Sequence, residues 1–239
     1  KEDKHKKAAK EHSIKASQKR KDKKNSGKLK EAKKKKSAIG KQIKKALKFE
    51  FPKLPDRKKI IEETLSFDFP ILSLSKNIST LELFHGPTMA FKDVGARFMA
   101  RCLGYFNKNN NNEVTVLVAT SGDTGAAVAN GFLGVKNVKV VILYPSGKVS
   151  AIQEKQLTTL GGNVTALEVD GTFDDCQRLV KQAFLDEELR AAFDLASANS
   201  INIARLIPQS FYYFAAYAQA KKKGLTAPVV FSVPSGNFG

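Results

Sequence analysis

The chain has 239 residues, of which 42% are hydrophobic, and it carries a formal net charge of +18. This length and this apolar content allow one sizeable α/β domain and exclude a peptide or a chain that is disordered throughout. The two cysteines are too few for a disulfide framework, and no apolar run approaches the roughly 20 residues of a membrane span. We therefore expect a cytoplasmic protein that does not enter a membrane.

The positive charge is concentrated at the start of the chain. Residues 1–50 hold 21 of the 41 Lys and Arg but only 6 of the 23 Asp and Glu, so the remainder, with 20 basic and 17 acidic side chains, is close to neutral. Residues 1–48 are rich in Lys and have almost no aromatic side chain, which predicts a disordered or helical tail. Charge runs without interleaved aromatic residues are typical of solvated appendages, so we do not expect nucleic acid as a partner.

Prolines interrupt residues 49–80, which we interpret as a linker, and regular alternation of extended and helical patterns begins after them. Apolar, β-branched runs predict buried strands at 114–120, 138–144, 163–169 and 228–233, with a weaker candidate at 193–197. Helical patterns occur at 93–107, 124–133, 149–160, 173–191 and 203–223. This alternation predicts an α/β fold, a parallel sheet flanked by helices, which binds ligands at the carboxyl ends of its strands.

Two loops that follow predicted strands are rich in small residues. In residues 120–125 (TSGDTG), backbone N–H groups and hydroxyls precede a helix and could converge on an anion, or Asp123 or Thr124 could simply cap that helix. Residues 234–239 (PSGNFG) follow the last predicted strand and offer N–H groups to a phosphate in the same way. Neither loop identifies a reaction by itself.

Lys92 stands at the start of the helix predicted at 93–107, directly after Phe91. A lysine there could bond covalently to a carbonyl-bearing cofactor within reach of both loops, although a lysine at a helix start is more often solvated. Further along the chain, Tyr212 lies at helical spacing with other tyrosines and is expected to pack.

The surroundings of Lys92, residues 82–98 (ELFHGPTMAFKDVGARF), resemble the pyridoxal-phosphate attachment segment shared by threonine synthases and serine/threonine dehydratases. The form HGPTMAFKD is most similar to that of the threonine synthase family. Three further segments resemble this family in the same order: 121–127 (SGDTGAA), 197–206 (SANSINIARL) and 233–239 (VPSGNFG). The resemblance implies the tryptophan synthase β-like fold, pyridoxal-phosphate fold type II, with a catalytic region over residues 81–239.

The resemblance also implies roles for individual residues. Lys92 would carry pyridoxal 5'-phosphate and then act as the proton-transfer base. The cofactor would further contact Gly236, Asn237, Phe238 and Gly239, the substrate carboxylate would lie against Thr120, Ser121, Asp123 and Thr124, and the substrate phosphate against Asn199, Ser200, Asn202 and Arg205. Arg205 suits bidentate recognition of a phosphate, and the alternative is an ordinary arginine on a helix surface. No metal site is implied.

The reaction implied is the conversion of O-phospho-L-homoserine and water to L-threonine and phosphate. Residues 49–80 would include a remnant of the family's N-terminal domain, and we expect an N-terminally altered, C-terminally truncated fragment that is inactive alone, monomeric or homodimeric. Two alternatives stay open. A related lyase such as a threonine dehydratase would share the lysine and the fold, and a noncatalytic basic protein would bind nucleic acid through its tail.

Overall fold

A four-stranded parallel sheet forms the centre of the computed structural model, which describes residues 57–109, 112–199, 202–225 and 228–233. The strand order is β5-β4-β3-β6, and the strands are β3 (Val114–Ala119), β4 (Val138–Pro145), β5 (Val164–Val169) and β6 (Asp194–Ser197). Every residue of β3 is buried, because this strand has neighbours on both sides and helices on both faces. Burial of both faces explains why its sequence is apolar almost throughout, without alternation.

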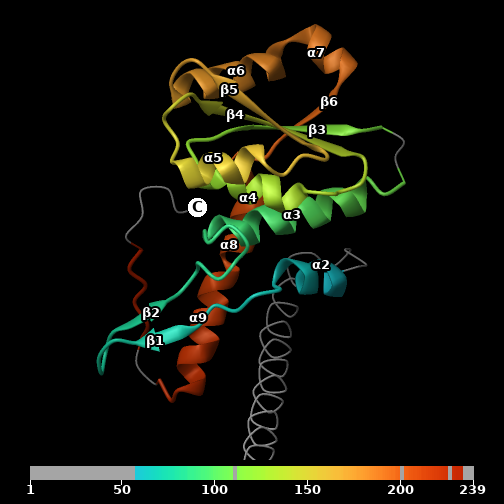
Figure 1. Ribbon diagram of the computed structural model, residues 1–239. Helices are drawn as coiled ribbons and strands as arrows, with labels where there is room; N and C mark the ends of the chain where they lie inside the picture. The colour runs from blue at the N-terminus through green and yellow to red at the C-terminus, as the bar shows by residue number, and fades with distance from the viewer. Residues whose placement is uncertain (1–56, 110–111, 200–201, 226–227, 234–239) are drawn as a thin grey trace, which may run out of the picture.

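Helices cover both faces of the sheet, as Figure 1 shows. On one face lie α6 (Phe173–Leu185) and α7 (Glu187–Ala192), and on the other lie α4 (Asp123–Phe132) and α5 (Ala151–Thr158). The long helix α3 (Lys92–Phe106) packs on α4 and forms a further layer. The main core lies between the sheet and these helices, and Val116, Phe132 and Ile142 are fully buried in it.

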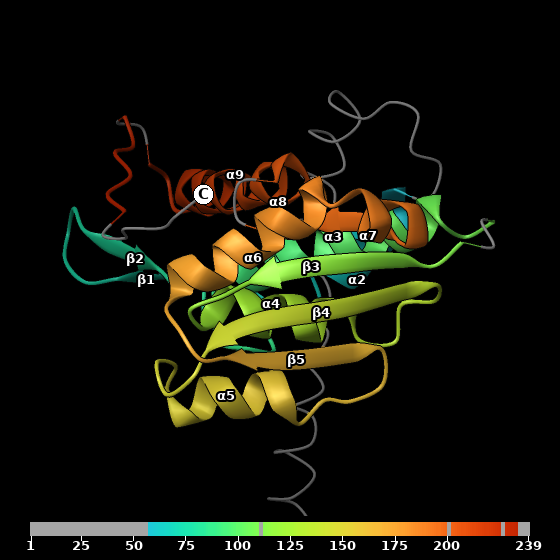
Figure 2. The ribbon, with the colours of Figure 1, turned by 90° about the horizontal axis from the view of Figure 1, so that it is seen from above.

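A second cluster of elements packs on the outer side of α3. It contains α2 (Arg57–Thr64), α8 (Ile203–Gln209), α9 (Phe211–Lys222) and a two-stranded antiparallel hairpin of β1 (Ile71–Ser73) and β2 (Ser79–Leu81). Figure 2 shows α8 and α9 beside α3, with the hairpin beyond them. Phe98, Phe211 and Tyr212 form part of a separate apolar core here. Helix α3 is therefore packed on two sides, against α4 and against this second cluster.

Arg97 fastens α2 to α3. Its guanidinium donates to the carbonyls of Glu63 (2.6 Å) and Thr64 (3.3 Å), the last residues of α2. A cation there satisfies carbonyl groups that have no partner within the helix and complements the helix dipole. The described part of the predicted linker thus contains a helix and a hairpin, and the boundary at residue 81 stays a prediction.

The structure confirms four of the five predicted strands and corrects the fifth. Residues 228–233 are described, yet they belong to no strand, so the prediction of a buried strand there is wrong. Val230 is 90% exposed and therefore lies outside the core that its apolar sequence suggested. An apolar run forms a strand only where neighbouring strands accept its backbone bonds, and no pairing reaches this run.

Two predicted helices are each divided in two. The helix predicted at 173–191 breaks at Asp186, whose backbone is extended and whose carboxylate accepts the N–H of Leu189 (2.9 Å) as the cap of α7. The helix predicted at 203–223 is interrupted at Ser210, two residues after Pro208. Proline removes one helical N–H, and the Ser210 hydroxyl donates to the carbonyl of Ile207 (2.6 Å). In both cases a local side-chain bond replaces continuation of the helix.

Within the part of the chain that the structure describes, no helix is long and apolar enough to cross a membrane. The predicted tail of residues 1–48 lies outside the described residues.

Candidate active site

The strand order places a switch of direction between β3 and β6. The chain passes from β3 to β4 and β5 on one side and then returns to β6 on the other side of β3. Loops that follow two such neighbouring strands leave in opposite directions, and the crevice between their carboxyl ends is the usual ligand site of an open parallel sheet. The side chain of Asn199, after β6, joins the two ends here by accepting the N–H of Ala119 (3.3 Å).

Lys92 is the first residue of α3, and its amine lies near this switch point. Burial lowers the pKa of the Lys92 ammonium, nearby Arg205 lowers it further, and Asp123 opposes the fall. The charges of Asp123 and Arg205 both act on Lys92, and α3 packs on both α4 and α8, so the starts of these three helices lie near one another. A lysine of lowered pKa is neutral more often at pH 7, which is the form that bonds to a carbonyl.

Arg205 is fully buried on α8. Its Nη1 donates to the carbonyl of Ala198 (2.8 Å), whereas Nε and Nη2 have no hydrogen-bond partner among the described residues. Burial lowers the pKa of this guanidinium to about 10. The alternative of an ordinary surface arginine is therefore wrong. Two buried, unpaired donors fit an anion, which would reach them only after the surrounding residues have moved.

The loop after β3 is held together from beneath by Thr120. Its buried hydroxyl accepts the N–H groups of Gly122 (3.0 Å) and Gly125 (2.8 Å) and donates to the Gly122 carbonyl (3.0 Å). The residue that caps α4 is Gly122, at φ 142°, and it forms no side-chain cap. Capping by Asp123 or Thr124 is thus wrong, since both lie inside the helix. The Thr120 hydroxyl is occupied within the loop, which leaves exposed Ser121 as the hydroxyl on its outer side.

Two asparagines of the predicted set hold backbone. Asn202 caps α8 by accepting the N–H of Ala204 (2.9 Å), and its amide donates to the carbonyl of Ser197 (2.7 Å) at the end of β6. Asn199 joins the ends of β3 and β6, as described above. Both therefore set the direction in which the chain turns from β6 into α8 and brings Arg205 under the site. The predicted positions Ser200, Gly236, Asn237, Phe238 and Gly239 lie outside the described residues.

The sequence did not reveal the contacts of Thr88, Asp93 and Tyr212 with the backbone next to Lys92. Asp93 is 1% exposed and accepts two hydrogen bonds from Thr88. The hydroxyl of Tyr212 donates to the carbonyl of Phe91, in addition to the packing that was predicted for this ring. The acidic residue after the lysine was the available signal for Asp93, whereas contacts over 121 residues, such as that of Tyr212, leave no local pattern.

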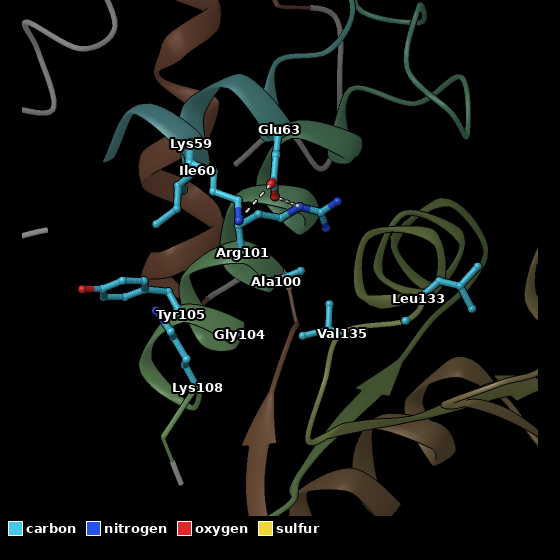
Figure 3. A pocket seen from close by; sticks show the side chains of 11 residues that line it. Lys59, Ile60, Glu63, Ala100, Arg101, Gly104, Tyr105, Lys108, Leu133 and Val135 are labelled. Atoms are coloured by element: carbon cyan, nitrogen blue, oxygen red, sulfur yellow. Dashed lines mark ion pairs between the residues drawn. The ribbon is translucent and has the colours of Figure 1, made fainter. Parts of the chain in front are cut away.

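A hollow of about 370 Å³ lies elsewhere, between α2, α3 and the turn that follows α4 (Figure 3). Its wall includes Lys59, Glu63 and Arg101, and the Glu63 carboxylate pairs with both Lys59 (3.9 Å) and Arg101 (3.4 Å). None of the predicted site residues lines it. The hollow is thus separate from the site at Lys92.

Comparison with known proteins agrees with the geometry. Residues 74–239 match the sequence pattern of the family described as "Pyridoxal-phosphate dependent enzyme". The chain belongs to this pyridoxal-phosphate-dependent family. Its cofactor is accordingly pyridoxal phosphate, and the half-buried amine of Lys92 at the carboxyl ends of the strands fits a cofactor that needs a neutral lysine.

Within the pyridoxal-phosphate-dependent family, the chain is similar to threonine synthases. It is 57% identical over 182 residues to the threonine synthase of Buchnera aphidicola subsp. Baizongia pistaciae, with 76% of this chain and 42% of that protein covered. The crystal structure of threonine synthase from Escherichia coli matches with a TM-score of 0.69 and 51% identity, covering 76% of this chain and 42% of the other. The pyridoxal-phosphate-bound threonine synthase from Brucella melitensis matches with a TM-score of 0.64 and 42% identity, over 68% of this chain and 36% of that one.

The chain spans about 42% of the length of the curated relatives it matches first. The fold prediction is confirmed by these comparisons, since a parallel sheet flanked by helices is shared with fold type II enzymes.

Proposed function

We propose that this chain carries the catalytic-lysine region of a threonine synthase, which converts O-phospho-L-homoserine and water to L-threonine and phosphate. The observation that supports it most is the convergence of Lys92, Asp123 and Arg205 at the switch point of the sheet. A nucleophilic amine, a helix start and a buried guanidinium together suit a substrate that is an amino acid at one end and a phosphate at the other. The identity of 57% over 182 residues to a threonine synthase supports the same substrate.

Lys92 would bind the cofactor covalently and later move protons. Pyridoxal phosphate, when bound, supplies an electron sink that makes removal of protons from carbon feasible. The lowered pKa of Lys92 suits a base that takes a proton first from Cα and then from Cβ of the substrate. The backbone N–H groups of residues 236–239 would hold the cofactor phosphate, with Asn237 on the side of the ring.

The loop after β3 would hold the substrate carboxylate. The first N–H groups of a helix have no partners within it, and its dipole favours an anion there. Ser121 would add its hydroxyl at the start of α4, with Asp123 and Thr124 beside it. Thr120 would act through the shape of the loop, because its hydroxyl already holds Gly122 and Gly125.

Arg205 would bind the phosphate that leaves from Cγ of the substrate. Its two unpaired nitrogens are suited to two oxygens of one phosphate, and the bonds would be charge-assisted. Asn199, Ser200 and Asn202 would surround the same group. Because the guanidinium is fully buried, binding requires a local movement of the residues that cover it.

The setting of the enzyme is part of the proposal. Both cysteines, Cys102 and Cys176, are free, which is consistent with a reducing, cytoplasmic compartment. The partner we propose is the small-molecule substrate and not nucleic acid, and monomer and homodimer both remain open.

Replacing Lys92 tests this function. In the protein supplied with pyridoxal phosphate, Lys92→Ala should abolish the absorbance of the bound cofactor and the release of phosphate from phosphohomoserine. The matched control is Lys108→Ala, which removes an exposed lysine just beyond the other end of α3 and should leave both unchanged. Retained phosphate release in Lys92→Ala would contradict the role of Lys92. If the wild-type protein deaminates threonine and releases no phosphate from phosphohomoserine, the dehydratase is favoured.

A further inference from the structure

The turn of residues 86–91, directly before Lys92, contains a strained residue. Met89 has φ 56°, although it is not a glycine, and its side chain is 65% exposed. The left-handed region is unfavourable for an L-residue other than glycine, so the surrounding contacts must hold Met89 there. Since the exposed Met89 side chain packs little, those contacts come from its neighbours.

Asp93 supplies two of these contacts from the first turn of α3. Its Oδ2 accepts the backbone N–H of Thr88 (2.9 Å), and its Oδ1 accepts the Thr88 hydroxyl (2.5 Å). Both residues are buried. Burial raises the pKa of the Asp93 carboxyl, whereas the two Thr88 bonds and the charge of Arg97 oppose that rise. Both oxygens of the Asp93 carboxylate therefore bind Thr88, the residue next to Met89, and hold the turn against the first turn of α3.

The turn is packed around this carboxylate. A Cβ at Gly86 would lie 2.9 Å from the Phe67 ring and 3.0 Å from the Asp93 Cβ, which is too close for any other residue. On the far side of the turn, the Tyr212 hydroxyl of α9 binds the carbonyl of Phe91, the residue before Lys92. The backbone that leads into Lys92 is thus held at both ends of the turn.

We propose that Thr88 and Asp93 are positioning residues, which hold the turn of residues 86–91 in its strained form and thereby fix the direction in which Lys92 presents its amine. The proposal rests on the proposed function only in taking Lys92 as the residue that carries the cofactor. Neither residue is assigned contact with substrate or cofactor. Without this pair the turn relaxes at Met89, and the amine leaves the half-buried position beside Asp123 and Arg205.

Two variants test the pair, one through each partner. Thr88→Val removes the hydroxyl donor with little change of volume and leaves the Asp93 charge in place. Asp93→Asn removes the carboxylate charge and keeps the size of the side chain. Thr88→Ser is the conservative variant, because it keeps both donors. The matched control is Asp175→Ala on α6, across the sheet, which breaks a pair of the same kind: Asp175 accepts the N–H (2.8 Å) and hydroxyl (2.7 Å) of Thr172.

The measurement is the pH at which acetylation of Lys92 is half-maximal in the cofactor-free chain. Competitive labelling with detection by mass spectrometry gives this midpoint. Thr88→Val and Asp93→Asn should raise the midpoint toward the ordinary lysine value of about 10.4, because a released amine loses the burial that lowers its pKa. Thr88→Ser and Asp175→Ala should keep the wild-type midpoint. Wild-type midpoints in both Thr88→Val and Asp93→Asn, or an equal rise in Asp175→Ala, would overturn the proposal.

Failure of the proposed function is recognised separately. Borohydride reduction of the wild-type protein mixed with pyridoxal phosphate should leave the cofactor covalently attached to Lys92. If no adduct forms there, Lys92 does not carry the cofactor and the proposed function fails, whereas the acetylation midpoints still decide whether Thr88 and Asp93 position the amine.

Discussion

At the scale of single residues, the side chains at the site divide into those that we propose to contact a ligand and those whose polar atoms hold the backbone. Lys92 and Arg205 were predicted from sequence, because their chemistry is conspicuous within the motifs that contain them. Thr120 and Asn202 were also selected, yet their polar atoms hold loops and helix starts. A motif therefore identifies the neighbourhood of a site more reliably than the task of each polar atom in it.

Arg205 shows how such a site costs stability. A buried charge with unpaired donors opposes folding, and an apolar replacement of similar size is often neutral or stabilising by about 1–4 kcal/mol. Arg205→Met should therefore keep or raise the free energy of urea unfolding. At the same time it should raise KM for phosphohomoserine about tenfold or more, since a hydrogen bond to a charged group contributes about 1.5–3 kcal/mol.

The control for Arg205→Met is Arg178→Met, which removes an exposed arginine paired with Asp175 on α6. It should change the unfolding free energy by less than about 1 kcal/mol and leave KM unaltered. A loss of several kcal/mol of stability in Arg205→Met would show that the guanidinium has stabilising partners in the folded protein beyond the Ala198 carbonyl, and would contradict two donors left for an anion.

At the scale of elements, the sequence predicted the four strands of the parallel sheet and helical patterns between them. It could not predict where a helix is divided, because Asp186 and Ser210 decide this through single side-chain bonds. Nor could it predict that residues 228–233 stay outside the sheet, since an apolar run does not state which strand it will pair with. The close contact of α3 with α8 likewise depends on Gly95 and on residues more than 100 positions away.

Two glycines of α3 test that contact. A Cβ at Gly95 would lie 2.9 Å from the backbone oxygen of Arg205, which cannot move without α8, whereas at Gly104 its nearest neighbour is a methyl of Val135 at 3.0 Å. Gly95→Ala should therefore lower the unfolding free energy by about 1–3 kcal/mol through overpacking. Gly104→Ala should be neutral or stabilise by up to about 1 kcal/mol, because alanine favours the helix and the methyl can yield. Equal urea midpoints in the two variants would contradict a close approach of the backbones.

At the scale of the whole molecule, charge and structure are distributed differently along the chain. Residues 1–50 carry most of the net charge, and the described residues contain the sheet, its helices and the part of the candidate site around Lys92 and Arg205. The α/β class was predicted correctly because the alternation of strand and helix patterns repeats several times between residues 93 and 223, so that errors in single elements do not change it. The sequence did not predict helix α2, which lies between the tail and the first predicted helix. Its sequence, RKKIIEET, is mostly polar, because only one face of the helix is buried against α3.

Two deletions separate the tail from α2. Removing residues 1–48 should change the melting temperature by less than about 2 °C, because a Lys-rich segment with few apolar side chains has little to bury. Removing residues 1–65 also deletes Ile60 and Ile61, which are 4% and 1% exposed, and uncovers α3. Burial of two such side chains contributes about 3–6 kcal/mol, so the longer deletion should lower the melting temperature by about 10 °C or more. Circular dichroism melts of the full chain and the two deletion variants measure these melting temperatures. A large fall with the shorter deletion would show that the tail packs on the domain, and an unchanged melt with the longer one would show that α2 does not belong to the folded unit.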